Sequence, residues 1–167
     1  TGDEYILLYH TQALKFGWKI NDVTFYTGVT VDANGKETCV DPVDMSTLSV
    51  GNEFDSGAYP GSSGTTYSVA NMLDGDEDTA WRSRCLNCNR DQGSGAWVGF
   101  SFKPPTGVDV RCVRVSQGTC QSTCAQEVVV HRGVLPASGE ALVQGRGRVD
   151  VSAARRAHWS DERVEFG

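Results

Sequence analysis

The stretch that decides the fold, residues 70–83, reads Ala-Asn-Met-Leu-Asp-Gly-Asp-Glu-Asp-Thr-Ala-Trp-Arg-Ser. Within it, Asp74, Asp76 and Asp78 alternate with other residues, and Thr79 adds a hydroxyl. All four side chains offer oxygen, and a hard cation such as Ca²⁺ takes about six to eight oxygen ligands. The spacing and the closing bidentate glutamate of an EF-hand loop are missing. We therefore predict a cation-binding turn of another type, the alternative being a solvated acidic turn.

The pattern A-N-x-x-D-G-D-x-x-T-A-W-x-S in this stretch resembles the opening motif of the F5/8 type C (discoidin) family, which includes galactose-binding carbohydrate-binding modules. The similarity runs from about Thr47 to about Gln117 and continues faintly to the end of the chain. Members of this family are jelly-roll β-sandwiches whose binding loops lie at one end. The resemblance thus implies an all-β jelly-roll sandwich, with one galactose-binding-like domain over 1–167. In this division 1–46 is an N-terminal strand extension and 47–167 is the family-like core.

The resemblance also implies a Ca²⁺ cofactor. In calcium-binding relatives this loop wraps the ion, and the tryptophan of the motif is buried beneath it. By residue match, Asp74 gives a side-chain oxygen, Thr79 gives its hydroxyl and carbonyl, and Asn71 and Asp76 give their carbonyls. The family's closing strand often brings a glutamate to the ion, and Glu162 holds that place here. The expected metal ligands are therefore these five residues.

An internal similarity links the two ends of the chain. The spacing Trp159-x4-Val-x-Phe near the C-terminus repeats the spacing that begins at Trp18. In the N-terminal copy, Asn21 stands at the place of Glu162. We interpret the repeat as a sign that the chain is one unit, or a piece, of a repeated protein.

The composition favours β structure in a single domain. The chain has 167 residues and 19 glycines, and short runs of valine, phenylalanine and tyrosine lie between glycine and aspartate residues. A helical turn is expected at 67–73 and a tight turn at Asn34-Gly35. Alternation and β-branched content predict strands at 5–10, 18–31, 97–102, 110–117, 127–131, 140–144 and 148–152.

The charge of the chain limits its partners. A net charge of −6 argues against a broad electrostatic attraction to nucleic acid or to anionic lipid. There is no run of about 18 apolar residues, so no transmembrane span is predicted. Three arginines, at positions 82, 84 and 90, nevertheless follow the acidic stretch. They could contact an acidic sugar or a partner's carboxylate, or form a solvated face.

The cysteines indicate an oxidising compartment. Six cysteines are an even and high number for this length, which predicts disulfide-stapled loops. Such a protein is expected to be secreted, or to occupy another oxidising lumen such as the secretory pathway or the thylakoid. The alternative is a zinc site from the second, third, fifth and sixth cysteines, although the spacing of the last pair is loose. The cysteines are Cys39, Cys85, Cys88, Cys112, Cys120 and Cys124.

Candidate ligand-binding residues are aromatic or basic. Aromatic faces and bidentate arginine donors suit the rings, hydroxyls and carboxylates of sugars. The sequence shows no nucleophile elbow, dinucleotide fingerprint or phosphate loop, and its three histidines are far apart. We therefore expect a protein that is not an enzyme. The candidates for ligand contact are Tyr59, Arg82, Arg84, Arg90 and His131.

Two functions are compatible with these features. The first is a calcium-stabilised, non-catalytic module that recognises a glycan or glycoconjugate. The second is a structural or accessory subunit that docks on a protein partner in a larger assembly, outside the cell or in an organelle lumen, with a possible peripheral association with a membrane complex. Lipid binding through apolar side chains on basic loops is disfavoured, because the net charge opposes anionic membranes and no such pattern is visible in the sequence.

Overall fold

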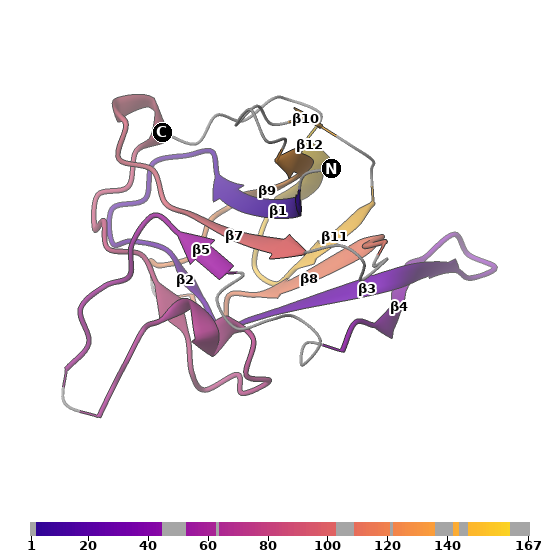
Figure 1. Ribbon diagram of the computed structural model, residues 1–167, viewed down its shortest axis with the longest axis horizontal. Coiled ribbons are helices and arrows are strands. Elements are labelled where there is room, and N and C mark those ends of the chain that lie inside the picture. Colours follow the sequence, from indigo (N-terminus) through magenta and orange to yellow (C-terminus); the bar gives the residue numbers. More distant parts are fainter. Residues whose placement is uncertain are drawn as a thin grey trace.

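The chain folds into two main β-sheets (Figure 1). The computed structural model describes residues 3–44, 53–62, 64–102, 109–120, 122–135, 142–143 and 147–160. Over these residues the protein is mostly β, with two short 3₁₀ turns, η2 (Val69–Met72) and η3 (Arg90–Gln92). The prediction of an all-β chain is confirmed.

The larger sheet has the strand order β10-β9-β1-β7-β5, and β12 also pairs with β9. Neighbouring strands in this sheet are antiparallel, except that β12 runs parallel to β9. The strands are β1 (Asp3–His10), β5 (Glu53–Asp55), β7 (Trp97–Phe102), β9 (Glu127–Leu135), β10 (Leu142–Val143) and β12 (Arg156–Ser160).

The smaller sheet has the order β11-β8-β3-β4, and β2 and β6 form a separate two-stranded ribbon. The β3–β4 hairpin extends beyond the rest of the molecule (Figure 1). Its turn contains Asn34 and Gly35, as predicted, and the Gly35 N–H donates to the Asp32 carbonyl. The strands are β2 (Lys19–Ile20), β3 (Asp22–Val31), β4 (Glu37–Pro42), β6 (Trp81–Arg82), β8 (Cys112–Ser116) and β11 (Arg148–Val151).

One hydrophobic core fills the space between the two sheets. Phe25 of β3 meets Phe100 of β7 edge to face, with ring centroids 5.1 Å apart. Around this contact, Val23, Val113 and other alternate residues of the facing strands are almost completely buried. Each such apolar side chain contributes about 1.5–3 kcal/mol on burial. The core therefore holds the two sheets against each other.

The N-terminal segment lies at the centre of both sheets. The β1 strand lies between β9 and β7, and β3 lies between β8 and β4. In the larger sheet Ile6 pairs with both Phe100 and Arg132. The segment predicted as an N-terminal strand extension, 1–46, thus supplies one central strand to each sheet.

A break at Asn21 divides the strand that the sequence predicts over 18–31. Simple alternation would place Ile20 and Val23 on opposite faces. Both are buried in the same core, because β2 ends at Ile20 and β3 begins at Asp22. The mixed pattern that the sequence shows here is thus the trace of a change of direction between two strands.

Most predicted strands are present, and four others were missed. The strands β1, β3, β7, β8, β9 and β11 and the turn η2 lie where the sequence predicts them, within a few residues. The missed strands are β4, β5, β6 and β12. Their partners are distant in sequence or their apolar content is low; β12, for example, pairs with β9 across about 30 residues of chain.

The six cysteines form three pairs at disulfide distance. Cys39–Cys112 joins β4 to β8, with a Cα–Cα distance of 5.7 Å. The other two pairs, Cys85–Cys88 and Cys120–Cys124, each close a short loop, with Cα–Cα distances of 5.3 Å. All three distances lie in the disulfide range of about 4.4–6.8 Å. This pairing argues against the alternative of a zinc site, because cysteines in disulfides have no thiolate to give to a metal.

The outer face of the larger sheet is also buried. Tyr5, Leu7, Tyr9 and Val129 form a second apolar cluster on this face, with Trp97 packed against it. Among the described residues, no helix is long and apolar enough to cross a membrane.

Candidate functional site

The acidic turn is built by aspartates whose side chains bond to the backbone that follows. Gly75 has a φ of 73°, a left-handed conformation that a glycine adopts without strain. Asp74 Oδ1 accepts the N–H of Asp76 at 2.9 Å, and Asp76 Oδ1 accepts the N–H of Asp78 at 2.9 Å. These side-chain turns fix the loop and leave the second oxygen of Asp74 facing its interior.

Four oxygen atoms meet in this turn. Thr79 Oγ1 lies 2.5 Å from Asp74 Oδ2, 3.0 Å from the Asp76 carbonyl and 3.4 Å from the Asn71 carbonyl. A hydroxyl has one proton, so Thr79 can donate fully to one of these three oxygens. The donor set is one carboxylate, two carbonyls and one hydroxyl, which is oxygen chemistry that suits Ca²⁺.

Four of the five predicted metal ligands are therefore brought together. The Asn71 side chain helps to hold the arrangement, because its Nδ2 donates to the carbonyls of Thr66 at 2.7 Å and Ala80 at 2.9 Å. Glu162, the fifth predicted ligand, lies outside the described residues.

The structure places two further residues against the acidic turn that sequence reasoning did not nominate. Asn21 Nδ2 donates to the Glu77 carbonyl at 2.8 Å, and its buried Oδ1 has no hydrogen-bond partner. Burial raises the pKa of the neighbouring Asp22, the Thr24 hydroxyl opposes this shift, and the negative charges of Glu77 and Asp74 add to it. Asp22 is thus a partly buried carboxylate beside other carboxylates, where a bound cation would relieve the repulsion. The internal repeat could have pointed to Asn21 and its neighbour Asp22, because it aligns Asn21 with Glu162, which is a predicted metal ligand.

Trp81 ties the acidic turn to the core, as the resemblance implies. Its side chain is completely buried and meets Trp18 edge to face at 6.0 Å. Its Nε1 donates to Asp55 Oδ2 at 2.8 Å. Trp18 Nε1 in turn donates to Gln117 Oε1 at 2.8 Å, inside the core. The acidic turn is therefore followed by a tryptophan that is anchored in the core, and both buried indole N–H groups are hydrogen-bonded.

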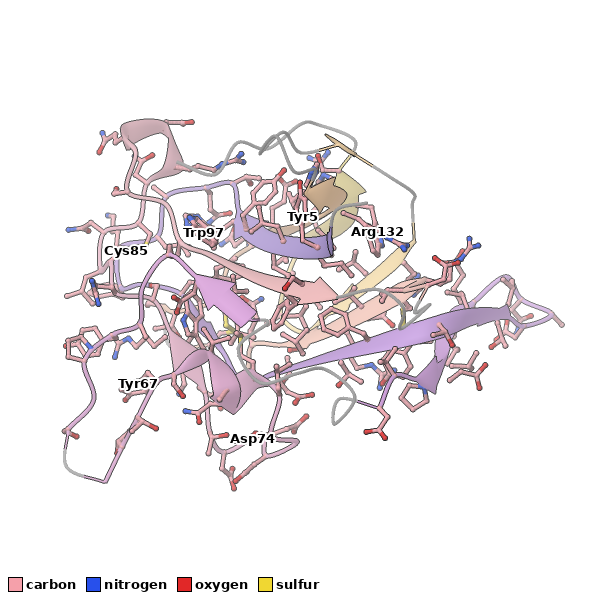
Figure 2. All side chains as sticks on the ribbon, in the orientation of Figure 1. Tyr5, Tyr67, Asp74, Cys85, Trp97 and Arg132 are labelled. Atoms are coloured by element: carbon pink, nitrogen blue, oxygen red, sulfur yellow. A yellow bond between two sulfur atoms is a disulfide. The ribbon has the colours of Figure 1, made fainter. Side chains whose placement is uncertain are left out.

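A second feature, the Tyr59 cluster, consists of Tyr59, Tyr67 and Arg82. The two rings meet edge to face with centroids 6.0 Å apart, and the Arg82 guanidinium lies 4.5 Å from the centroid of Tyr59. Arg82 also donates from Nη2 to the Phe16 carbonyl at 3.3 Å. In Figure 2, Tyr67 lies on the side of the molecule opposite the tip of the β3–β4 hairpin.

A third feature is an open groove, which we call the Arg84 groove. It lies between the end of β5, the Cys85–Cys88 loop and the start of β7, and Cys85 and Trp97 mark it in Figure 2. The Arg84 backbone N–H donates to the Gly57 carbonyl at 2.9 Å, which fixes this wall. Its lining residues are Asp55, Ser56, Arg84, Cys85, Gly93, Ser94, Gly95 and Trp97.

The remaining two predicted ligand residues do not line this groove. The Arg90 guanidinium lies 4.0 Å from the centroid of Tyr9, which occupies it with a cation–π contact. His131 is completely buried, and its Nε2 lies 3.0 Å from the Tyr5 hydroxyl. Burial lowers the pKa of His131, and a backbone hydrogen bond with Ser160 opposes this shift. The structure thus places His131 in the interior, away from the groove and the Tyr59 cluster.

A fourth feature, the apolar edge, consists of Phe16 and Leu86. These side chains are 57% and 45% exposed, and the Gly17 N–H donates to the Leu86 carbonyl at 2.7 Å, so the two loops are neighbours. Leu14 and Cys88 exchange two backbone hydrogen bonds, of 2.8 and 2.7 Å, that hold the loops together. This pairing could not be predicted from the sequence, because the two loops are about 70 residues apart.

Comparisons with protein-family models, with curated proteins and with solved structures found no match for this chain.

Proposed function

We propose that this chain is a non-catalytic binding module of discoidin type, with jelly-roll topology, that recognises a glycan at its loop end. The observation that carries the proposal is the Arg84 groove, where an arginine, an aspartate and a tryptophan converge on one open surface. Sugars are bound by such mixtures, because aromatic faces cover the C–H surfaces of the ring and charged groups bond to its hydroxyls. The Tyr59 cluster adds two further rings on the neighbouring segment.

Calcium has a supporting role in this proposal. The Ca²⁺ ion would be held by the Asp74 carboxylate, the Thr79 hydroxyl and the carbonyls of Asn71 and Asp76. The next β element after this turn, β6, carries Arg82 and is followed by Arg84. A bound cation would therefore fix the start of the segment that presents both arginines, without touching the sugar.

The disulfides support a place in an oxidising environment, and we propose that the protein is secreted or lumenal. The Cys85–Cys88 pair borders the groove and restricts the loop that forms one of its walls. A restricted loop loses less conformational entropy when it binds a ligand.

A glycan panel tests the proposal. The chain is expected to bind a subset of immobilised neutral and acidic oligosaccharides in Ca²⁺ buffer, and to bind them several-fold more weakly after treatment with a chelator. A panel without any binding, from a sample that circular dichroism shows to be folded, would refute glycan recognition.

A calcium titration tests the cation site separately. Isothermal calorimetry of the calcium-stripped protein is expected to detect one site, which Asp74→Ala abolishes. The matched control is Asp32→Ala, because Asp32 makes a similar side-chain turn in the β3–β4 hairpin by accepting the N–H of Asn34 at 2.8 Å. Equal calcium binding by both variants would place the ion elsewhere.

A second function is favoured by the apolar edge. Exposed Phe16 and Leu86 on one rigid pair of loops form a surface that a protein partner could cover. Under this alternative, the protein purified from its native source stays in a stoichiometric complex, and Phe16→Ser with Leu86→Ser releases it. The control Val31→Ser alters an equally exposed apolar residue at the far hairpin and should leave the complex intact. A free monomer that is retained on a sugar column would favour the glycan module.

A further inference from the structure

We propose that the Arg84 groove selects a carboxylate-bearing sugar, such as a hexuronic or sialic acid residue, and that Arg84 binds its carboxylate. This inference rests on the proposed glycan recognition and adds the chemical class of the ligand. Four observations support it. The Arg84 guanidinium has no partner among the described residues, and its stem packs against Gly57. The groove also contains polar groups that suit a sugar, and the arginines of a second groove are paired with carboxylates.

Arg84 differs from most other arginines of the described chain because its guanidinium has no hydrogen-bond, ion-pair or cation–π partner there. The exposed Arg155 shares this property, but it does not line the groove. The other described arginines are engaged by carboxylates, carbonyls or aromatic rings. These are Arg82, Arg90, Arg111, Arg114, Arg132, Arg148 and Arg156.

The stem of Arg84 is held in place although its head is free. A Cβ on Gly57 would lie 3.3 Å from Arg84 Cβ and Nε and 3.5 Å from its Cδ, so the side chain lies directly against this glycine. Gly57 has a φ of 117°, which other residues rarely adopt. The packing leaves fewer rotamers to Arg84 before a ligand arrives, which lowers the entropic cost of binding.

The polar groups of the groove suit a ligand that carries one negative charge and several hydroxyls. Asp55 is the acidic residue among those that line the groove, and one of its oxygens already accepts from Trp81 at 2.8 Å. Its other oxygen has no donor among the described residues and can accept from a sugar hydroxyl. The planar fork of Arg84 matches a planar carboxylate with two parallel hydrogen bonds. Trp97 supplies an apolar wall for the ring.

A second groove in the smaller sheet shows what a groove with occupied arginines looks like. It is lined by Arg111 and Arg148 together with Glu37 and neighbouring residues. Arg111 bonds to Asp109 at 2.8 Å, and Arg148 bonds to Glu37 at 3.1 Å. The charges there are neutralised within the chain, whereas the charge of Arg84 is left for a ligand.

The test compares acidic and neutral oligosaccharides of matched linkage and length. Calorimetry with the whole chain in Ca²⁺ buffer measures binding of oligosaccharides that end in hexuronic acid, in sialic acid or in the neutral hexose. The variants are Arg84→Ala, Arg84→Lys and the control Arg155→Ala. We expect at least one acidic series to bind about tenfold or more tightly than the neutral one, and Arg84→Ala to remove that preference.

Each outcome has a distinct meaning. Loss of the preference in Arg84→Ala, with Arg155→Ala unchanged, supports the inference, and a large loss in Arg84→Lys shows that the bidentate fork is needed in addition to the charge. An acidic preference that persists in Arg84→Ala overturns the inference. Equal binding of neutral and acidic sugars also overturns it but leaves glycan recognition in place, whereas no binding of any sugar refutes the proposed function itself.

Discussion

At the scale of single residues, Asp22 connects the core to the acidic turn. It lies at the first position of β3, and its carboxylate is disfavoured by burial and by the charges of Glu77 and Asp74. Asp22→Asn keeps the shape and removes one negative charge. The calcium-free variant is therefore expected to melt at a higher temperature than the parent chain, and to bind Ca²⁺ about tenfold or more weakly. Thermal melts with and without Ca²⁺ measure both effects.

The opposite pattern would contradict this account of Asp22. A variant that melts lower without Ca²⁺ and keeps the parent affinity would show that Asp22 has a structural role alone. Thr24→Val serves as a comparison, because it removes the hydroxyl that bonds to Asp22 at 3.0 Å and leaves the charge in place.

Two buried histidines predict how stability depends on pH. Burial lowers the pKa of His10, with a smaller contribution from the charge of Arg90, although a hydrogen bond to Gln12 opposes the shift. Burial likewise lowers the pKa of His131. Below the ordinary histidine pKa of about 6.5, the unfolded chain therefore takes up protons before the folded chain does.

Stability is consequently expected to be constant above that pH and to fall as the pH drops through it toward the lowered values of the folded state. His10 would lose a specific contact when protonated, because its Nε2 accepts the Ala96 N–H at 2.9 Å. The free energy of unfolding, measured with denaturant between about pH 8 and about pH 5, tests this expectation, because the range spans the ordinary histidine pKa. The exposed control His158→Gln should retain the whole fall, and a flat profile in the parent chain would be inconsistent with two neutral buried rings.

At the scale of elements, the three disulfides should contribute unequally. Cys39–Cys112 closes a loop with a sequence separation of 73, whereas Cys85–Cys88 closes one of 3. The chain-entropy relation gives about 4 kcal/mol for the first and about 2 kcal/mol for the second. Paired serine substitutions at each bridge, followed by urea unfolding, test this ranking. An equal or reversed loss would mean that the short bridge is supported by more than loop entropy.

The elements also show which parts of the fold the sequence could predict. Alternation found β7 and β8, where Val98, Phe100, Val113 and Val115 are buried at every second position. Alternation misplaced the faces of 18–31, because the break at Asn21 lets Ile20 and Val23 enter one core. The mixed pattern of 18–31 marks an irregular strand, but it does not show at which residue the strand breaks.

The candidate site was predictable to the extent that its residues are neighbours in sequence. Asn71, Asp74, Asp76 and Thr79 meet in one turn, as the motif indicated. Tertiary packing brings Asp22 to this turn, places Phe16 beside Leu86, and buries His131. The type of each residue alone could not predict which of them would lie at a site and which in the core. Arg84 was nominated for its type, but its availability depends on Gly57, which only the folded chain shows.

At the scale of the whole molecule, the N-terminal segment should be essential for folding. The strands β1 and β3 each have a neighbour on both sides, and 1–43 also contains β4. Removing this segment would expose the edges of β9 and β7 in the larger sheet, the edge of β8 in the smaller sheet, and much of the core. A chain that begins at residue 44 is therefore expected to lack cooperative unfolding and dispersed amide resonances. A folded 44–167 fragment with the calcium affinity of the full chain would show that the first segment is an addition to a complete core.

The central claim is that the loop end around Arg84 binds a glycan. The most direct measurement is amide NMR of the whole chain, titrated with the oligosaccharide that gives the strongest response on the glycan panel. We predict that the largest shift changes fall on Asp55, Arg84, Ser94 and Trp97, and that the hairpin residue Asn34 stays unchanged. Shift changes centred on the β3–β4 hairpin or on the second groove, with the Arg84 groove unaffected, would contradict the account.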